Sequence, residues 1–256
     1  MIGKVFQVLD TFTPEQPELG VREIARRLQL APSTVGRILV ELSKAQVVVQ
    51  NPQTQRYSLS ARVLRWARAS QQLNSLRQMS LSILQALNQS TGETATLSIL
   101  QGKNRLVLER VESPYAMRYV INPGDILPLH SGASGKIFLA FMDQKQREEI
   151  LSDTGLPSFT DNTITDRQKL EEELRKIRQQ GYAISIGERV RDTASVAAPV
   201  FNTRGEVVAS ISISGPLTRL NVQQLELYKD KVIQACRELS QVMSDFSDTN
   251  TIHEKL

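Results

Sequence analysis

Apolar residues recur at helical spacing in two short runs near the N-terminus, and a four-residue break, Gln29 to Pro32, separates them. Positions three, four and seven apart share one face of an α-helix, so each run predicts an amphipathic helix. Pro32 cannot continue the first helix but can begin the second. Two helices joined by so short a turn indicate a helix-turn-helix. The apolar positions are Val21, Ile24, Ala25 and Leu28 in the first run, and Val35, Ile38, Leu39 and Leu42 in the second.

The polar face of the second run carries Ser33, Thr34 and Arg37 near its beginning. In a helix-turn-helix bound to DNA, the N-terminal residues of the second helix lie at the base edges of the major groove. An arginine can bond guanine through two donors, and a hydroxyl can bond a base or a phosphate. We therefore predict that these three residues contact bases. A solvated helical hairpin in another kind of α domain is the alternative.

Further basic residues are placed where phosphates would lie. Arg22, Arg26 and Arg27 lie on the first helix, which crosses the DNA backbone in this motif. Residues 47–50 and 56–59 predict two short strands around a polar turn, a hairpin or wing directly after the second helix. Arg56, beside the turn, is predicted to reach the adjacent phosphates. Alternatively, the hairpin only closes a small core.

The distribution of charge favours DNA as the partner of this region. The chain has 256 residues and a formal net charge of +4. Residues 1–72 contain ten basic and five acidic side chains, whereas residues 73–256 contain 21 basic and 22 acidic ones. The excess positive charge therefore lies in the first part, as contact with phosphates requires.

Beyond the wing, the pattern predicts a helix over residues 61–74 that can join two domains. From residue 75, helices alternate with strands linked by short turns, which is typical of an α+β domain with a mostly antiparallel sheet. The remaining predicted helices cover residues 2–12, 78–90, 131–141, 166–180 and 221–246, and the predicted strands cover residues 94–100, 105–110, 117–121, 182–186, 195–201 and 207–214.

Two polar features of the second part indicate a pocket. Serine and isoleucine alternate strictly from residue 210, so Ser210, Ser212 and Ser214 share one strand face. Burying serine hydroxyls without hydrogen-bond partners costs free energy, so this face suits the wall of a polar pocket. A solvated outer face is the alternative. The small residues 131–135 open a helix whose free N–H groups favour an anion. They also suit close packing of the helix on a sheet, and both interpretations can hold.

The same run of small residues does not match the sequence motifs of a catalytic nucleophile or of a nucleotide-binding loop. His130 occupies the first glycine position of a phosphate-binding loop, and Ile137 occupies its Ser/Thr position. Gly135 follows Ser134 directly, which breaks the spacing of a nucleophile elbow. One cysteine and two histidines offer no metal-ligand cluster. We predict no catalytic residue, no metal and no cofactor, and keep two alternatives: a hydrolase using Ser134, and a winged helix that contacts only protein.

The single cysteine, Cys236, excludes a disulfide within the chain and fits a reducing compartment. The N-terminus is too short and interrupted for a signal peptide. No apolar run approaches the ~18 residues that a membrane span needs. We therefore expect a cytoplasmic protein without a membrane partner.

Blocks of sequence along nearly the whole chain resemble the IclR family of bacterial transcriptional regulators. The N-terminal blocks are REIARRLQL…STVGRILVEL and the hairpin ending RYSLS. The C-terminal blocks are LPLHSGASGKIFLAFM, GYAISIGE and SVAAPVFNTRGEVVASISISGP, which are the more specific ones in this order and spacing.

The resemblance implies an α+β fold with four parts. These are a winged helix-turn-helix DNA-binding domain at residues 1–60, a linker helix at 61–74, a GAF-like α/β effector-binding domain at 75–247 and a flexible tail at 248–256. It also implies a homodimer or dimer of dimers on a palindromic operator in double-stranded DNA.

The resemblance further implies a small-molecule effector, often a carboxylate or aromatic acid. Ser185 stands where some members carry an acidic residue, and Ser195 where a cysteine can occur. A pocket of hydroxyls and backbone N–H groups without a carboxylate should favour an anion. By correspondence of the blocks, the effector-binding residues are Gly132, Ala133, Ser134, Ser185, Ser195, Ser212 and Ser214.

Overall fold

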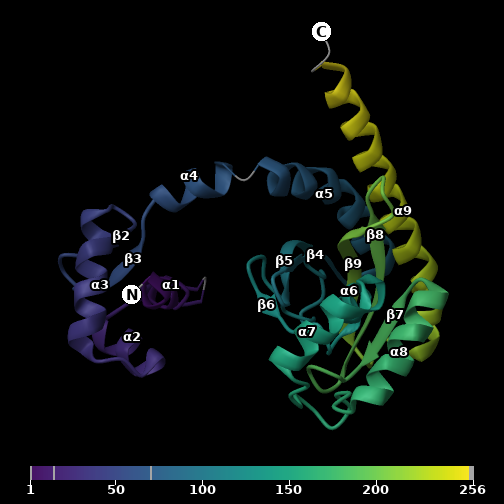
Figure 1. Ribbon diagram of the computed structural model, residues 1–256, viewed down its shortest axis with the longest axis horizontal. Coiled ribbons are helices and arrows are strands. Elements are labelled where there is room, and N and C mark those ends of the chain that lie inside the picture. The colour runs from purple at the N-terminus through teal and green to yellow at the C-terminus, as the bar shows by residue number, and fades with distance from the viewer. Residues whose placement is uncertain (1, 14, 70, 254–256) are drawn as a thin grey trace. The chain divides into compact units, whose positions relative to one another are not determined.

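The computed structural model describes residues 2–13, 15–69 and 71–253 (Figure 1). The chain forms two compact units, Met1–Gln72 and Leu73–Leu256, each with a hydrophobic core of its own. The boundary between them falls inside the linker helix predicted over residues 61–74. Among the described residues, no helix is both long and apolar enough to cross a membrane.

The N-terminal unit is a winged helix-turn-helix, as the sequence predicts. Its strands form a small antiparallel sheet in the order β1-β3-β2, in which β1 is a short strand that the sequence pattern did not indicate. The apolar faces of its first three helices meet over this sheet. The elements are α1 (Ile2–Leu9), β1 (Glu18–Leu19), α2 (Val21–Leu28), α3 (Pro32–Lys44), β2 (Val48–Gln50), β3 (Tyr57–Leu59) and α4 (Arg62–Ala69).

Local backbone geometry produces the turn between α2 and α3. Gln29 adopts a left-handed conformation with φ 52°, and the N–H groups of Gln29 and Leu30 bond back to the last carbonyls of α2. Pro32 then supplies the first position of α3, where its missing N–H costs nothing. The short turn thus ends one helix and begins the next at a fixed angle.

The linker differs from its prediction as one helix over residues 61–74. The structure has α4, which ends at Ala69, and α5 (Gln71–Thr91), while residue 70 lies outside the described residues. The guanidinium of Arg62 donates to the carbonyl of Ala45, which ties the start of α4 to the end of α3. The predicted helix over residues 78–90 is therefore the later part of the longer α5.

The C-terminal unit contains one six-stranded sheet in the order β6-β5-β4-β9-β8-β7, and all its neighbouring strands are antiparallel. Helices cover both faces, so the α+β fold predicted for this part is confirmed (Figure 1). After α5, its elements are β4 (Thr94–Gln101), β5 (Asn104–Val111), β6 (Ile126–Leu127), α6 (Ala133–Phe141), α7 (Gln144–Thr154), α8 (Arg167–Gln180), β7 (Ala183–Ile186), β8 (Thr193–Phe201), β9 (Val207–Pro216) and α9 (Val222–His253).

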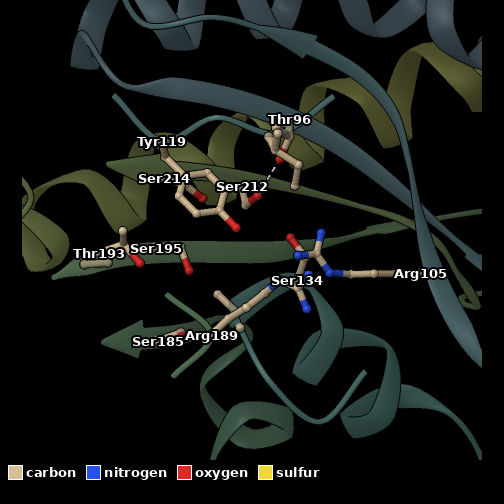
Figure 2. A pocket seen from close by; sticks show the side chains of 14 residues that line it. Thr96, Arg105, Tyr119, Ser134, Ser185, Arg189, Thr193, Ser195, Ser212 and Ser214 are labelled. Carbon is tan, nitrogen blue, oxygen red and sulfur yellow. Dashed lines mark hydrogen bonds between the residues drawn. The ribbon is translucent and has the colours of Figure 1, made fainter. Parts of the chain in front are cut away.

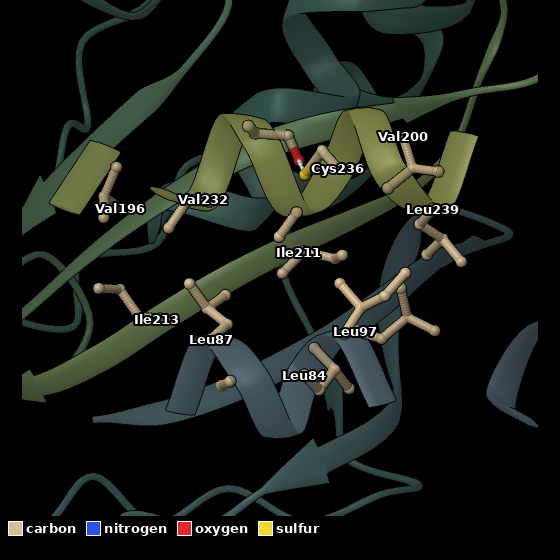
Figure 3. Close-up of a cluster of buried hydrophobic side chains, with 14 of the residues drawn as sticks. Leu84, Leu87, Leu97, Val196, Val200, Ile211, Ile213, Val232, Cys236 and Leu239 are labelled. Carbon is tan, nitrogen blue, oxygen red and sulfur yellow. Dashed lines mark hydrogen bonds between the residues drawn. The ribbon is translucent and has the colours of Figure 1, made fainter. Parts of the chain in front are cut away.

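The main core lies between one face of the sheet and helices α5 and α9 (Figure 3). Leucines of α5 face Leu97 of β4 and the isoleucines of β9, because alternate strand positions point to this side. Cys236 of α9 is buried here, and its thiol donates to the carbonyl of Ala198 at 3.2 Å. Burial raises the pKa of this thiol to about 12, so it behaves as a packing group.

The opposite face of the sheet carries the serines of β9. Ser210, Ser212 and Ser214 are all buried, so the interpretation of a solvated outer face is wrong. Helix α6 lies over this face, and α7 and α8 pack around it in a second apolar cluster. The three serines share one side of the strand, as the alternation predicts.

Four further elements differ from their predictions, and the first is the short strand β6, which was not predicted. No strand forms over residues 117–121; this segment is held by side chains instead, including Arg110 and Arg219, which donate to the carbonyls of Ile121 and Met117. Helix α7 was not predicted and begins after Asp143, whose carboxylate accepts the N–H of Gln146. Helix α9, predicted to end at residue 246, continues to His253, and residues 254–256 of the predicted flexible tail lie outside the described residues.

Small residues at the start of α6 allow it to approach the chain closely. A methyl group at Gly135 would lie 2.4 Å from the carbonyl oxygen of Leu129, which is a backbone atom that cannot turn aside. The interpretation of close packing is therefore confirmed for Gly135. By contrast Gly36, inside α3, has no atom within 4 Å of such a methyl group.

We expect Gly135→Ala to destabilise the C-terminal unit by about 1–3 kcal/mol, because the added methyl group overpacks the contact with Leu129. The matched change Gly36→Ala adds the same group in open space and should stabilise its helix by up to about 1 kcal/mol. Chemical unfolding followed by circular dichroism measures both changes. A Gly135→Ala protein as stable as the wild type would contradict the close approach.

Candidate functional site

A cavity of about 30 Å³ lies between the serine face of the sheet and the beginning of α6 (Figure 2). All seven pocket residues expected from the sequence line it, although they come from four separate elements and their flanking turns. The remaining lining residues were not expected. They are Thr96, Arg105, Tyr119, Ile121, Arg189, Thr193 and Ala194.

Strand register brings the hydroxyl groups together. Ser195 of β8 pairs with Ser185 of β7 on one side and with Ser214 of β9 on the other. One step along the sheet, Thr96 of β4 pairs with Ser212, and their hydroxyl oxygens are 2.8 Å apart. Residues paired across antiparallel strands point to the same face, so the serines form one hydroxyl-rich wall.

The start of α6 forms the facing wall. Gly132 has φ 86°, a left-handed conformation that favours glycine, and the next residues begin the helix. The N–H of Gly132 donates to Glu188 at 3.0 Å, while the N–H groups of the first helical turn have no acceptor within the helix. Ala133 and Ser134 lie at this turn, and the Ser134 hydroxyl has no hydrogen-bond partner among the described residues.

A buried ion pair holds this wall in place. Lys136 is only 1% exposed, and its ammonium group donates to Glu188 at 2.6 Å, to Glu173 at 3.0 Å and to the carbonyl of Ile184 at 2.9 Å. The ammonium therefore has three acceptors for its three donors. Glu188 is shared between Lys136 and the N–H of Gly132, and it is not among the residues that line the cavity.

Arg105 lines the cavity but was not expected from the sequence. It extends from β5 into the cavity and is 5% exposed. Its Nη1 donates to the Ser98 hydroxyl at 3.1 Å, but its Nε has no hydrogen-bond partner, and no carboxylate pairs with it among the described residues. The alternation of side chains along the strand could have indicated that Arg105 points inward, because it occupies the same face as the buried Val107.

Burial is costly for the charge on Arg105. Removal from water lowers its pKa to about 10; Arg189 adds to this effect, while Tyr119 and Asp125 oppose it. Such a shift corresponds to roughly 3 kcal/mol against the charged form. The guanidinium is still charged at pH 7, so the folded protein bears this cost until an anion compensates it.

The hydrolase interpretation has no support in this geometry. His130 is buried and bonds the carbonyl of Pro157 at 2.9 Å through its Nε2, and no hydrogen bond joins it to Ser134 among the described residues. Burial lowers the pKa of His130 below its usual range. The described residues also contain no group of three or more side chains suited to hold a metal ion.

The second candidate surface is the beginning of α3. Ser33 and Arg37 are exposed, Thr34 is half-buried, and all three line a groove on the N-terminal unit. They face away from the core that Val35 and Leu39 fill. The structure thus exposes the side chains that the sequence assigned to base contacts.

The four arginines assigned to phosphates have different surroundings. Arg22 and Arg26 are exposed on α2, and Arg27, also exposed, donates to the carbonyl of Thr11 at 3.4 Å. Arg56 is set apart, because its Nη2 is 2.8 Å from a carboxylate oxygen of Glu23. Arg56 is therefore already engaged within the protein, although 40% of its side chain stays exposed.

We expect Arg105→Met to raise the free energy of unfolding by about 1–3 kcal/mol in buffer without organic anions, because it removes an uncompensated buried charge while keeping a long side chain. Arg105→Lys is the matched control, since it keeps the charge and should give no such gain. Urea unfolding at pH 7 measures both. A loss of stability in Arg105→Met would show that the guanidinium is compensated within the protein.

Family models match both parts of the chain. The model for the bacterial transcriptional regulator IclR C-terminal domain matches residues 69–241, and the model for the IclR helix-turn-helix domain matches residues 2–52. The HTH-type transcriptional regulator BhcR of Paracoccus denitrificans is 38% identical over 230 residues, which is 90% of this chain and 82% of that protein. The HTH-type transcriptional regulator KdgR of Escherichia coli is 31% identical over 241 residues, 94% of this chain and 91% of that protein.

Solved structures with the same fold include members of this family. The structure of IclR from Thermotoga maritima matches with a TM-score of 0.73 and 29% identity, covering 94% of this chain and 98% of that one. An IclR homologue from Microbacterium hydrocarbonoxydans, solved in complex with 4-hydroxybenzoate, matches with a TM-score of 0.82 and 26% identity over the same shares. The chain therefore belongs to the IclR family of bacterial transcriptional regulators.

Proposed function

We propose that this regulator binds operator DNA through α3 and changes its DNA affinity when a small organic acid occupies the cavity at Arg105. The proposed target is a metabolic or catabolic operon. The observation that supports an acid as the effector is the buried, uncompensated guanidinium of Arg105. An arginine at the wall of a cavity that is lined by no acidic residue suits a carboxylate, which it can bind through two parallel hydrogen bonds.

The rest of the cavity supports an anionic effector. The first turn of α6 adds N–H groups and the positive end of a helix dipole. None of the lining residues among those described is acidic, whereas two are arginines, Arg105 and Arg189. The related protein from Microbacterium hydrocarbonoxydans is complexed with 4-hydroxybenzoate, which is itself a carboxylate.

The N-terminal unit supplies the proposed DNA contacts. Ser33, Thr34 and Arg37 would bond base edges, since the start of α3 is exposed and the opposite face is packed. Arg22, Arg26 and Arg27 would bond phosphates. Arg56 is a weaker candidate for a phosphate, because contact would have to share or replace its bond to Glu23.

The proposed assembly is a homodimer or a dimer of dimers. One α3 covers a single half-site, and two copies related by a two-fold axis would cover a palindrome. An effector alters DNA affinity only if it binds one arrangement of the DNA-binding units better than another. Helices α4 and α5, between the two units, are the proposed connection.

We expect Arg37→Ala to weaken binding to an operator, selected from genomic fragments that the wild-type protein retains, by about 1–3 kcal/mol. Lys103→Ala removes the same charge from the C-terminal unit, where Lys103 pairs with Asp153, and serves as the control. Fluorescence anisotropy at fixed salt measures both affinities.

Arg37→Ala should bind small carboxylates as the wild type does, by calorimetry. Equal losses of operator affinity in Arg37→Ala and Lys103→Ala would reject the assignment of α3 to base contacts. Operator affinity that does not respond to any carboxylate bound by the protein would reject the proposed regulation.

A further inference from the structure

The cavity has two chemically different ends, and together they restrict the class of acid that it can hold. One end contains cationic groups, and the other contains only hydroxyl groups among its polar side chains (Figure 2). Ile121, Ala133 and Ala194 are the apolar residues of this lining, which is otherwise mostly polar, whereas sites for larger organic ligands are predominantly apolar.

The cationic end is formed by Arg105, Arg189 and the first residues of α6. A methyl group at Gly132 would lie 3.9 Å from Nη2 of Arg105, so the guanidinium reaches the beginning of the helix. The charges of Arg105 and Arg189 are close enough to oppose one another. No carboxylate lies within ion-pair distance of either guanidinium in the described parts of the chain. Two like charges beside one cavity favour a bound anion that contacts both.

Two buried polar groups at this end have unused bonding capacity. The Nε of Arg105 and the hydroxyl of Ser134 have no hydrogen-bond partner among the described residues, and both residues line the cavity. Ser134 is 3% exposed. The hydroxyls of Ser43, Ser131 and Ser210 also have no partner among the described residues, but only Arg105 and Ser134 of this group line the cavity, where a bound ligand can bond them.

The hydroxyl end is formed by side chains of β4, β7, β8 and β9. Each hydroxyl offers one donor and two acceptor positions, and the Thr96–Ser212 bond uses only one donor and one acceptor. A ligand carrying hydroxyl groups can use the remaining donors and acceptors, whereas a hydrocarbon chain would leave them unpaired. The residues are Thr96, Ser185, Thr193, Ser195, Ser212 and Ser214.

The cavity is small for an aromatic ring. Its volume is about 30 Å³, and one water molecule needs roughly 10–15 Å³. A cavity that accepts benzene has a volume of about 150 Å³. The space is therefore smaller than any organic acid, and a bound acid requires movement of the lining side chains that is smaller for a compact aliphatic acid than for one with a ring.

We propose, on the basis of the function proposed above, that the effector is a compact aliphatic hydroxy acid. Its carboxylate binds Arg105 and Arg189 at the start of α6, and its hydroxyl groups bond the wall that contains Ser212. Aromatic acids are disfavoured because they need a larger enlargement of the cavity, and unsubstituted aliphatic acids are disfavoured because they leave the hydroxyl wall unpaired.

Isothermal titration of the full-length chain with four small molecules separates the contribution of the carboxylate from that of the hydroxyl groups and that of ligand size. Racemic glycerate has a carboxylate and two hydroxyl groups, propionate keeps the carboxylate on the same three-carbon chain, glycerol keeps only hydroxyl groups, and benzoate adds a ring. Glycerate should bind at least about ten-fold more tightly than propionate or glycerol, since one or two hydrogen bonds are worth this factor. Benzoate should bind at least about ten-fold more weakly than glycerate, because its ring requires a larger enlargement of the cavity.

Paired variants test the two ends. Ser212→Ala should weaken glycerate about ten-fold and leave propionate unchanged, because only glycerate reaches the hydroxyl wall. Ser210→Ala is the matched control: Ser210 is a buried serine of the same strand face that does not line the cavity, and its removal should change neither affinity. Arg105→Met should abolish binding of both acids.

The outcomes distinguish this inference from the proposed function. Benzoate binding more tightly than glycerate, or propionate equalling glycerate, would overturn the hydroxy acid while leaving an acid effector in place. Absence of glycerate binding up to about 10 mM would also overturn it. Glycerol binding as tightly as glycerate, or full acid binding by Arg105→Met, would overturn the role of Arg105 and with it the acid effector.

Discussion

Strands β4, β8 and β9 are buried on both faces, and the two faces carry side chains of different chemistry. The rest of the structure depends on this difference. One face is apolar and packs against α5 and α9. The other carries serines and threonines and is covered by α6. Because side chains alternate along a strand, a shift of one residue in the pairing would move hydroxyl groups into the main core and isoleucines into the cavity. The register therefore maintains the core and the cavity at the same time.

The protein treats two buried cations in opposite ways. Lys136 is surrounded by two carboxylates and a carbonyl, so its charge is compensated and it holds α6 in place. Arg105 is nearly as buried but has only one hydroxyl partner, and its Nε bonds nothing in the described parts of the chain. A compensated buried charge is a structural element, whereas an uncompensated one costs stability. Proteins commonly accept such costs at functional sites.

The two units separate two kinds of recognition in this IclR-family protein. The N-terminal unit carries the excess positive charge of the chain and exposes Arg37 at the beginning of α3. The C-terminal unit is close to neutral overall, yet it places two arginines at one small cavity. Net charge along the sequence thus identifies the surface suited to a long polyanion but is insensitive to a pocket for a small one.

Local pattern in the sequence determined the helix-turn-helix, the wing, most strands of the sheet and the single face of Ser210, Ser212 and Ser214, because helical and strand periodicity depend on neighbouring residues. It also located the seven small and hydroxyl residues that meet at the cavity, through the likeness of their blocks to a family. Only the tertiary structure decided that the serine face is buried, that residues 117–121 form no strand and that Arg105 enters the cavity without a carboxylate. These outcomes depend on which segments distant in sequence cover a face or supply a partner, and periodicity carries no information about such contacts.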